Sequence, residues 1–210
     1  MLLDIFIPAL VTLFVILDPI GLMPIFAVMT KHGGEAYQRS MALRSTVVAT
    51  IVLVLAFFFG DMVLRLFGIT IPAFRIAGGV LLFATALEMI FEFSAKHRKK
   101  TAEEASHDHP AHEDISVVPL AFPLMAGPGA ITTTILLSSS HQGNLSAQLV
   151  VVAALLIVMF GTYLFYRVSG RVMELLGETV TSVITRLLGV ILAALAVQFI
   201  IDGVKGALIN

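Results

Sequence analysis

Six long apolar runs constrain this 210-residue chain more than any other feature. A helix needs about 20 consecutive apolar residues to cross the ~30 Å hydrocarbon core of a bilayer. Charged residues make up only 13% of the chain, against about 25% in soluble domains. The sequence therefore predicts an all-α, polytopic membrane protein with six transmembrane helices. We place them at about 3–29, 43–66, 73–94, 116–139, 147–168 and 184–204.

Composition and motifs argue against several function classes. The chain has no cysteine, which excludes thiol catalysis and cysteine-type zinc sites, and its net charge of −1 provides no basic field for nucleic acid. No P-loop, HExxH or GxSxG motif occurs, and all six histidines fall outside the apolar runs. We therefore expect no enzyme, no cofactor, no resident metal and no nucleic-acid partner.

The basic residues predict the orientation in the membrane. Ten of the 13 Lys and Arg residues fall on one face if the six runs alternate in direction, and only Arg65, Arg75 and Lys205 fall on the other. The positive-inside rule makes the first face cytoplasmic. The start, "MLLDIFIPAL", lacks a basic region and is expected to remain as a span. We expect a multi-pass protein of the bacterial inner membrane with both termini in the periplasm.

The two halves of the chain resemble each other. A shift of 109 residues places Asp18-Pro19 on Gly127-Pro128, and a shift of 111 places "RIAGGVLL" (75–82) on "RLLGVILA" (186–193). Each half has three spans, so the second half enters the membrane from the opposite side, a pattern common in transporters. We expect inverted three-helix repeats at 1–94 and 116–210, joined by a cytoplasmic linker at 95–115.

The linker contains a candidate metal site. It carries imidazole and carboxylate groups, which suit zinc or nickel. These groups are His107, Asp108, His109, His112, Glu113 and Asp114. The segment is also short and polar, and a solvated linker without metal is the favoured interpretation.

Proline, glycine and an acid interrupt the first and fourth spans near their midpoints. Proline removes a helical hydrogen bond, so "ILDPIGLMPIF" (16–26) and the Gly127-Pro128 pair predict broken helices. A break exposes backbone N–H groups and a helix dipole, which together attract anions. Non-helical backbone at this depth must face protein or an aqueous cavity. We therefore expect one central substrate site, formed by Asp18, Pro19, Gly21, Gly127, Pro128, Gly129, Thr132 and Thr133. The alternative is a proline kink in which Asp18 only caps its own helix.

Three further charged residues are candidates for a gate or a proton path. Arg75 and Arg186 head the third and sixth spans and are equivalent in the repeat, whereas Glu88 lies deeper in the third span. Anchoring of helix ends by snorkelling explains the two arginines equally simply, and it is the favoured interpretation for them. The small residues Gly78, Gly79, Ala193, Ala194 and Ala196 predict close helix packing.

Several of these segments together resemble one known family. "DPIGLMPIF", "FRIAGGVLL", "PLAFPLMAGPGA", "ITRLLG" and "QFIIDG" are similar to segments of the MarC family of bacterial inner-membrane proteins. The resemblance covers nearly the whole chain except the linker. It implies six spans and, by likeness to members grouped with LysE-type exporters, movement of small neutral amino acids such as glycine or alanine. The family often has asparagine where this chain has Asp18, so substrate or coupling can differ here.

The sequence thus favours a secondary transporter that moves a small neutral amino acid by alternating access. Asp18 is the candidate for proton coupling. A channel for a small solute or ion is the alternative, and an intramembrane enzyme is less favoured. We expect a small-molecule substrate and membrane lipids as partners, and the sequence leaves a homo-oligomer open.

Overall fold

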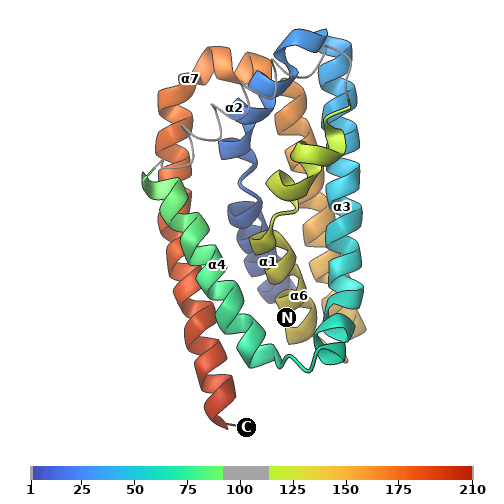
Figure 1. Ribbon diagram of the computed structural model, residues 1–210, viewed down its shortest axis with the longest axis vertical. Coiled ribbons are helices and arrows are strands. Elements are labelled where there is room, and N and C mark those ends of the chain that lie inside the picture. Colours follow the sequence, from blue (N-terminus) through green and yellow to red (C-terminus); the bar gives the residue numbers. More distant parts are fainter. Residues whose placement is uncertain (1, 92–113, 210) are drawn as a thin grey trace.

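The computed structural model describes residues 2–91 and 114–209, and these residues contain helices and no strand. Figure 1 shows a bundle of long helices. The elements are α1 (Leu3–Leu17), α2 (Pro19–Thr30), the short 3₁₀ turn η1 (Lys31–Gly33), α3 (Gly34–Leu66), α4 (Ile71–Phe91), η2 (Ser116–Met125), α6 (Pro128–Ser140) and α7 (Leu145–Ile209).

The helices account for the predicted spans. Five stretches are long and apolar enough to cross a membrane: 3–30, 34–66, 71–91, 145–170 and 179–208. The bent pair of η2 and α6 makes a sixth when it is counted as one span. The all-helical, polytopic membrane fold predicted from the sequence is confirmed.

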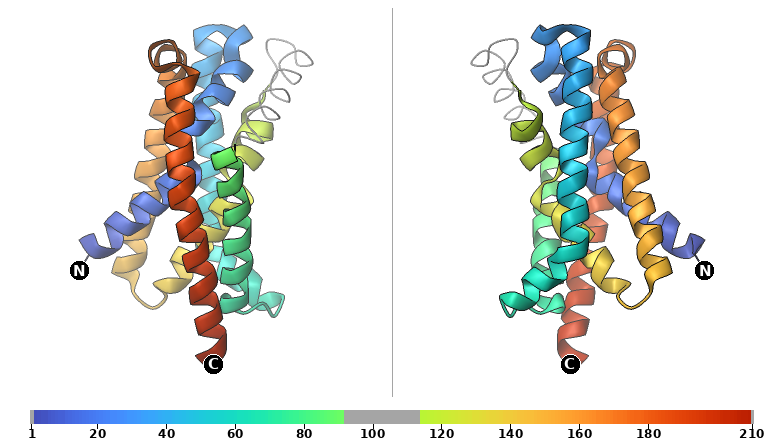
Figure 2. Two further views of the ribbon diagram at one scale, coloured as in Figure 1. Left: turned by 90° about the vertical axis from the view of Figure 1, so that its left-hand side faces the viewer. Right: turned by 90° about the vertical axis from the view of Figure 1, so that its right-hand side faces the viewer.

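Turns and chain ends gather at the two ends of the bundle as the alternating topology requires. Figure 1 shows η1 and the bend within α7 at one end. At the other end lie the connections 67–70 and 141–144, together with the C-terminal end of α7. The N-terminal end of α1 lies toward the same end. Figure 2 also shows the first turns of α1 standing away from the bundle, where Leu3 and Ile7 are exposed. Assignment of the ends to cytoplasm and periplasm stays a prediction.

Local sequence signals explain where α3 ends. Gly68 has a φ of 69°, a conformation that glycine adopts without steric cost. The backbone N–H of Ile69 bonds to the carbonyl of Leu64 at 2.9 Å, and the N–H of Gly68 bonds to that of Arg65 at 3.0 Å. These two bonds form a Schellman motif, which satisfies the last carbonyls of the helix.

The fourth span begins with an irregular helix. Residues Ser116–Met125 form π-type turns, and Val118 and Phe122, each followed by a proline, have extended backbone angles. After this segment the chain bends by 60° into α6. The predicted interruption near Gly127 is therefore present, and its first half is wound differently from an α-helix.

The last two spans form one element with a sharp bend. Gly177 has φ 70° and ψ 168°, values outside the helical region that a glycine accommodates easily. Figure 1 shows α7 rising along the bundle, turning at its end and returning antiparallel. The bend separates the stretches at 145–170 and 179–208.

Small residues bring α4 and the returning part of α7 into close contact. A Cβ atom at Gly79 would lie 2.7 Å from the carbonyl oxygen of Ala196. A Cβ atom at Gly189 would lie 3.2 Å from the carbonyl oxygen of Ala86. The contacts are nearly reciprocal under the 111-residue shift, which an inverted repeat requires. The predicted close packing at Gly79 and Ala196 is confirmed, whereas equivalence of the two halves over their whole length, 1–94 and 116–210, stays a prediction.

Candidate functional site

The first break is built around Asp18. This residue has φ 39° and ψ 58°, a left-handed conformation that ends α1 and begins α2. Aspartate and asparagine adopt this conformation more readily than most residues because their short side chains bond to the local backbone. Here Oδ1 of Asp18 accepts a 3.1 Å hydrogen bond from the backbone N–H of Gly21. Pro19 fills the first position of α2, where its missing N–H costs nothing.

The break also releases a carbonyl from helical bonding. Because Pro19 has no N–H, the carbonyl of Val15, four residues earlier, has no helical donor. This carbonyl end of α1 carries the negative end of the helix dipole, and the start of α2 carries the positive end. The carboxylate of Asp18 lies between the two helices. The first break therefore presents both polarities within a few residues.

Gly21 allows a side chain from the second half of the protein to approach this cap. A Cβ atom at Gly21 would lie 2.0 Å from Oδ2 of Asp18 and 2.9 Å from the hydroxyl oxygen of Thr185. That hydroxyl oxygen is buried and has no hydrogen-bond partner within the described part of the chain. Sequence analysis missed Thr185, because a single threonine within an apolar span has no distinguishing pattern.

The second break is a tight turn ahead of α6. Gly127 is extended, with φ −73° and ψ 171°, and Pro128 occupies the first helical position. A Cβ atom at Gly127 would lie 2.8 Å from the carbonyl oxygen of Pro123. The turn itself therefore requires glycine here, whether or not a ligand also binds.

α4 covers the first turn of α6. A Cβ atom at Gly129 would lie 2.8 Å from Cδ2 of Leu82, a fully buried residue of α4. Similarly, a Cβ atom at Gly78 would lie 2.1 Å from Cγ2 of Thr132. Leu82 of α4 therefore packs directly against the first turn of α6.

The three consecutive threonines of α6 differ in their bonding. All three are buried. The hydroxyl of Thr134 donates a 2.7 Å hydrogen bond to the carbonyl of Ala130, which satisfies it within the helix. The hydroxyl of Thr133 has no partner among the described residues. Of the two predicted threonines, Thr132 packs against α4 and Thr133 keeps hydrogen-bonding capacity for a ligand.

The two breaks share one core. Leu17 and Leu22 flank the first break, Ala126 and Ala130 flank the second, and all four belong to a single cluster of buried apolar side chains. α1 and α6 are in contact. Figure 1 shows the interruptions at similar heights in the middle of the bundle. The structure therefore places both breaks against the protein interior, where non-helical backbone can be accommodated within a membrane.

The predicted gate residues lie away from the breaks or from one another. Arg75, near the start of α4, donates a 3.1 Å hydrogen bond to the hydroxyl of Ser140 at the end of α6. Arg186 is exposed on α7, three residues before Gly189, which packs against the last turns of α4, and Glu88 is half-buried on α4. The structure does not bring Arg75 and Arg186 together. A gating or proton-path role for these three residues stays a prediction.

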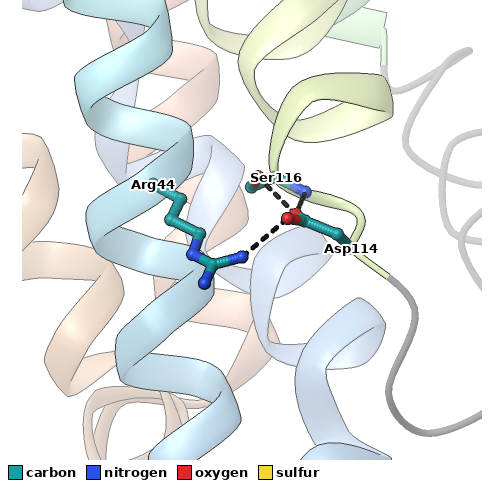
Figure 3. A network of polar contacts seen from close by, with 3 residues as sticks. All are labelled: Arg44, Asp114 and Ser116. Carbon is teal, nitrogen blue, oxygen red and sulfur yellow. Dashed lines mark hydrogen bonds and ion pairs between the residues drawn. The ribbon is translucent and has the colours of Figure 1, made fainter.

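A polar network fixes the start of the fourth span. Figure 3 shows Asp114 between Arg44 of α3 and Ser116 of η2. The Arg44 guanidinium lies 2.7 Å from Oδ2 of Asp114, and the hydroxyl and backbone N–H of Ser116 both donate to Oδ1. The hydrogen bonds from Ser116 hold the pKa of Asp114 below its ordinary value, and Arg44 lowers it further. Sequence analysis considered Asp114 only as a metal ligand.

The metal hypothesis for the linker cannot be placed on the structure. His107, His109 and His112, with Asp108 and Glu113, lie outside the described residues. Within residues 2–91 and 114–209, no three His, Asp or Glu side chains lie close enough to hold a metal ion.

Comparison with known proteins decides the family. The model of a family described as "MarC family integral membrane protein" matches residues 3–208. The chain belongs to the MarC family. This match confirms the resemblance found in the sequence motifs.

Relatives of the MarC chain occur in several bacteria and also in Archaeoglobus fulgidus and Methanocaldococcus jannaschii. It is 38% identical over 202 residues to a UPF0056 membrane protein of Buchnera aphidicola from Schizaphis graminum, covering 96% of this chain and 92% of the relative. It is 36% identical to UPF0056 membrane protein YhcE of Escherichia coli, covering 92% and 89%. UPF0056 membrane protein YvbG of Bacillus subtilis is 34% identical, with coverage of 93% and 92%. No solved structure matches this MarC chain significantly.

Proposed function

We propose that this MarC protein is a secondary transporter that moves a small neutral amino acid, such as glycine or alanine, by alternating access. The observation that carries the proposal is the meeting of two interrupted spans in one buried core. Discontinuous helices that place half-helix ends near the middle of the membrane are typical binding elements of transporters. The proposal also places the protein in the bacterial inner membrane, with both termini in the periplasm as the distribution of basic residues predicts.

The chemistry of the breaks suits a zwitterion. A free amino acid needs a partner for its carboxylate and another for its ammonium group. The positive N-terminal ends of α2 and α6 suit the carboxylate, with the Thr133 hydroxyl available near the second. The Asp18 carboxylate and the Val15 carbonyl suit the ammonium group. Residues beside both breaks belong to the same core cluster, and the proposal requires that one solute engage both sets of partners.

The packing of α4 against the α6 N-terminus is compatible with alternating access. Leu82 fills the space beside Gly129. In an alternating cycle the solute gains access when this contact opens toward one side while the other side stays closed. Movement of α4 relative to α6 is the conformational step that the proposal requires.

Counterflow in proteoliposomes tests the proposal. Vesicles containing the purified protein are loaded with unlabelled glycine or alanine, and uptake of the labelled amino acid is followed without any imposed ion gradient. A transporter gives transient accumulation above the equilibrium level, whereas a channel gives only equilibration. Protein-free vesicles and vesicles loaded with lactate serve as controls. The proposal is overturned if label never exceeds equilibrium for any small neutral amino acid.

A further inference from the structure

Three buried threonine hydroxyls have no hydrogen-bond partner among the described residues: those of Thr46, Thr133 and Thr185. Six helical threonine hydroxyls donate to the carbonyl four residues earlier, the usual way a hydroxyl is satisfied inside an apolar helix. They are Thr30, Thr50, Thr85, Thr134, Thr162 and Thr181. Thr185 lies on the same helix as Thr181, yet its buried hydroxyl oxygen makes no such bond. This hydroxyl therefore keeps its hydrogen-bonding capacity for another partner.

This hydroxyl faces the carboxylate at the first break. Oδ2 of Asp18 and the hydroxyl oxygen of Thr185 lie 2.0 Å and 2.9 Å from the same point, the position that a Cβ atom would take at residue 21. The two oxygens are therefore separated by no more than the sum of these distances. They come from opposite halves of the chain, and neither half can form the pair alone.

The chemistry of the pair selects a small positive group. Two side-chain oxygens, one of them from a carboxylate, lie close together at the first break. Carboxylate and hydroxyl oxygens suit a hard monovalent cation or an ammonium group. The tight approach of both oxygens to Gly21 limits the size of the group.

We propose that Asp18 and Thr185 form a binding site for a monovalent cationic group, either the ammonium end of the transported amino acid or a sodium ion. The inference rests on the proposed function for the location of the site, and it adds Thr185, from the second half, as a binding residue. Movement of the returning part of α7, together with α4, away from α1 and α2 would then separate the two oxygens and release the cation. Such a movement links binding to conformation.

Thermal unfolding of the purified protein tests the site directly. The chain has neither Trp nor Cys, so unfolding is followed by far-ultraviolet circular dichroism or by size-exclusion chromatography after heating. Melting temperatures are measured with sodium chloride, choline chloride, methylammonium chloride, glycine and potassium acetate at equal ionic strength. Stabilisation by sodium alone identifies an ion site. Stabilisation by methylammonium and glycine, without an effect of sodium or acetate, identifies the substrate ammonium group.

Matched variants make the test specific for the hydroxyl. Thr185→Val keeps the shape of the side chain. It is expected to lower the affinity for the stabilising cation at least about tenfold, because hydrogen bonds to charged groups are among the stronger ones. Thr185→Ser, which keeps the hydroxyl, is expected to retain binding. Thr162→Val removes a buried hydroxyl that bonds to its own helix and is expected to change nothing.

The outcomes separate this inference from the proposed function. The inference is overturned if no cation stabilises the wild-type protein beyond choline, or if Thr185→Val responds like the wild type. Cation binding that depends on Thr185, combined with an absence of counterflow, would instead reject the transporter proposal and keep the site. Counterflow that is unaffected by Thr185→Val, with no cation effect, would keep the transporter and reject the site.

Discussion

Replacement of Gly21 by alanine should abolish transport while leaving the protein folded. The new Cβ atom would lie 2.0 Å from Oδ2 and 2.8 Å from Cγ of Asp18, distances that real atoms do not sustain. The carboxylate is the end of a flexible side chain, so it moves and the fold adjusts cheaply. Once displaced, it no longer accepts the 3.1 Å hydrogen bond from position 21 or faces Thr185.

The expected change in stability is small because two effects oppose each other. Loss of a helix cap typically costs about 0.5–2 kcal/mol. Replacing a helical glycine by alanine typically stabilises by about 0.5–1 kcal/mol. The net change in the free energy of unfolding at Gly21 should therefore be about 1 kcal/mol or less. Transport depends on the position of the carboxylate, and the gain in helix stability from alanine does not offset its loss.

The assay compares counterflow and melting temperature in Gly21→Ala and in a matched control, Gly161→Ala. Gly161 also lies within a helix, and a Cβ atom there would meet nothing within 4 Å. The control should keep counterflow and gain a little stability. Normal counterflow by Gly21→Ala, or loss of it in both variants, would refute the assignment of the site to the first break.

Three further outcomes follow from the structure. Asp18→Asn should keep the fold, since asparagine caps helices as well as aspartate, but should abolish the response of glycine uptake to an imposed pH gradient; an unchanged response excludes a proton-carrying role. Gly79→Ala should lower the free energy of unfolding by about 1–3 kcal/mol, because its Cβ would press on the rigid carbonyl of Ala196; an unchanged melting temperature contradicts this packing. The lowered pKa of Asp114 stabilises the fold above the ordinary value of 3.8, and this contribution should be lost as the pH falls through and below that value. Its size should be below about 1 kcal/mol, because Arg44 and Asp114 are both exposed, and Asp114→Asn should show a correspondingly weaker acid-side loss in thermal melts.

Features encoded locally were predictable from the sequence. The thickness of the hydrocarbon core fixes the length of an apolar run, so the spans could be counted directly. An aspartate can cap the start of a helix, and the proline that follows it ends the preceding helix. The break at Asp18 was therefore evident. The start of α3 was less evident. The helix begins at Gly34, well before the apolar run near residue 43, because its first turns are polar and stabilised by pairs such as Glu35 with Arg39 at 3.2 Å.

Features that depend on contacts between distant segments were not predictable. Thr185 becomes a candidate only because α7 returns past Gly21. Its segment, "ITRLLG", stands out in the sequence through the family resemblance and Arg186, and neither points to the threonine. The π-type winding of η2 has prolines as a local signal, but its form depends on its packing against α3 and on the Asp114 network. The role of Gly129 was anticipated as access for a ligand, whereas the structure shows it filled by Leu82.

The seam of glycines between α4 and the end of α7 determines which parts can move as rigid bodies. Gly79, Gly189 and Gly203 each bring backbone of one helix against the other, and sliding or parting these helices would sacrifice contacts that no other side chain could replace. The two helices belong to different halves of the chain, yet they form one mechanical unit. The dividing plane of any transport cycle therefore cuts through both halves and does not follow the linker that joins them.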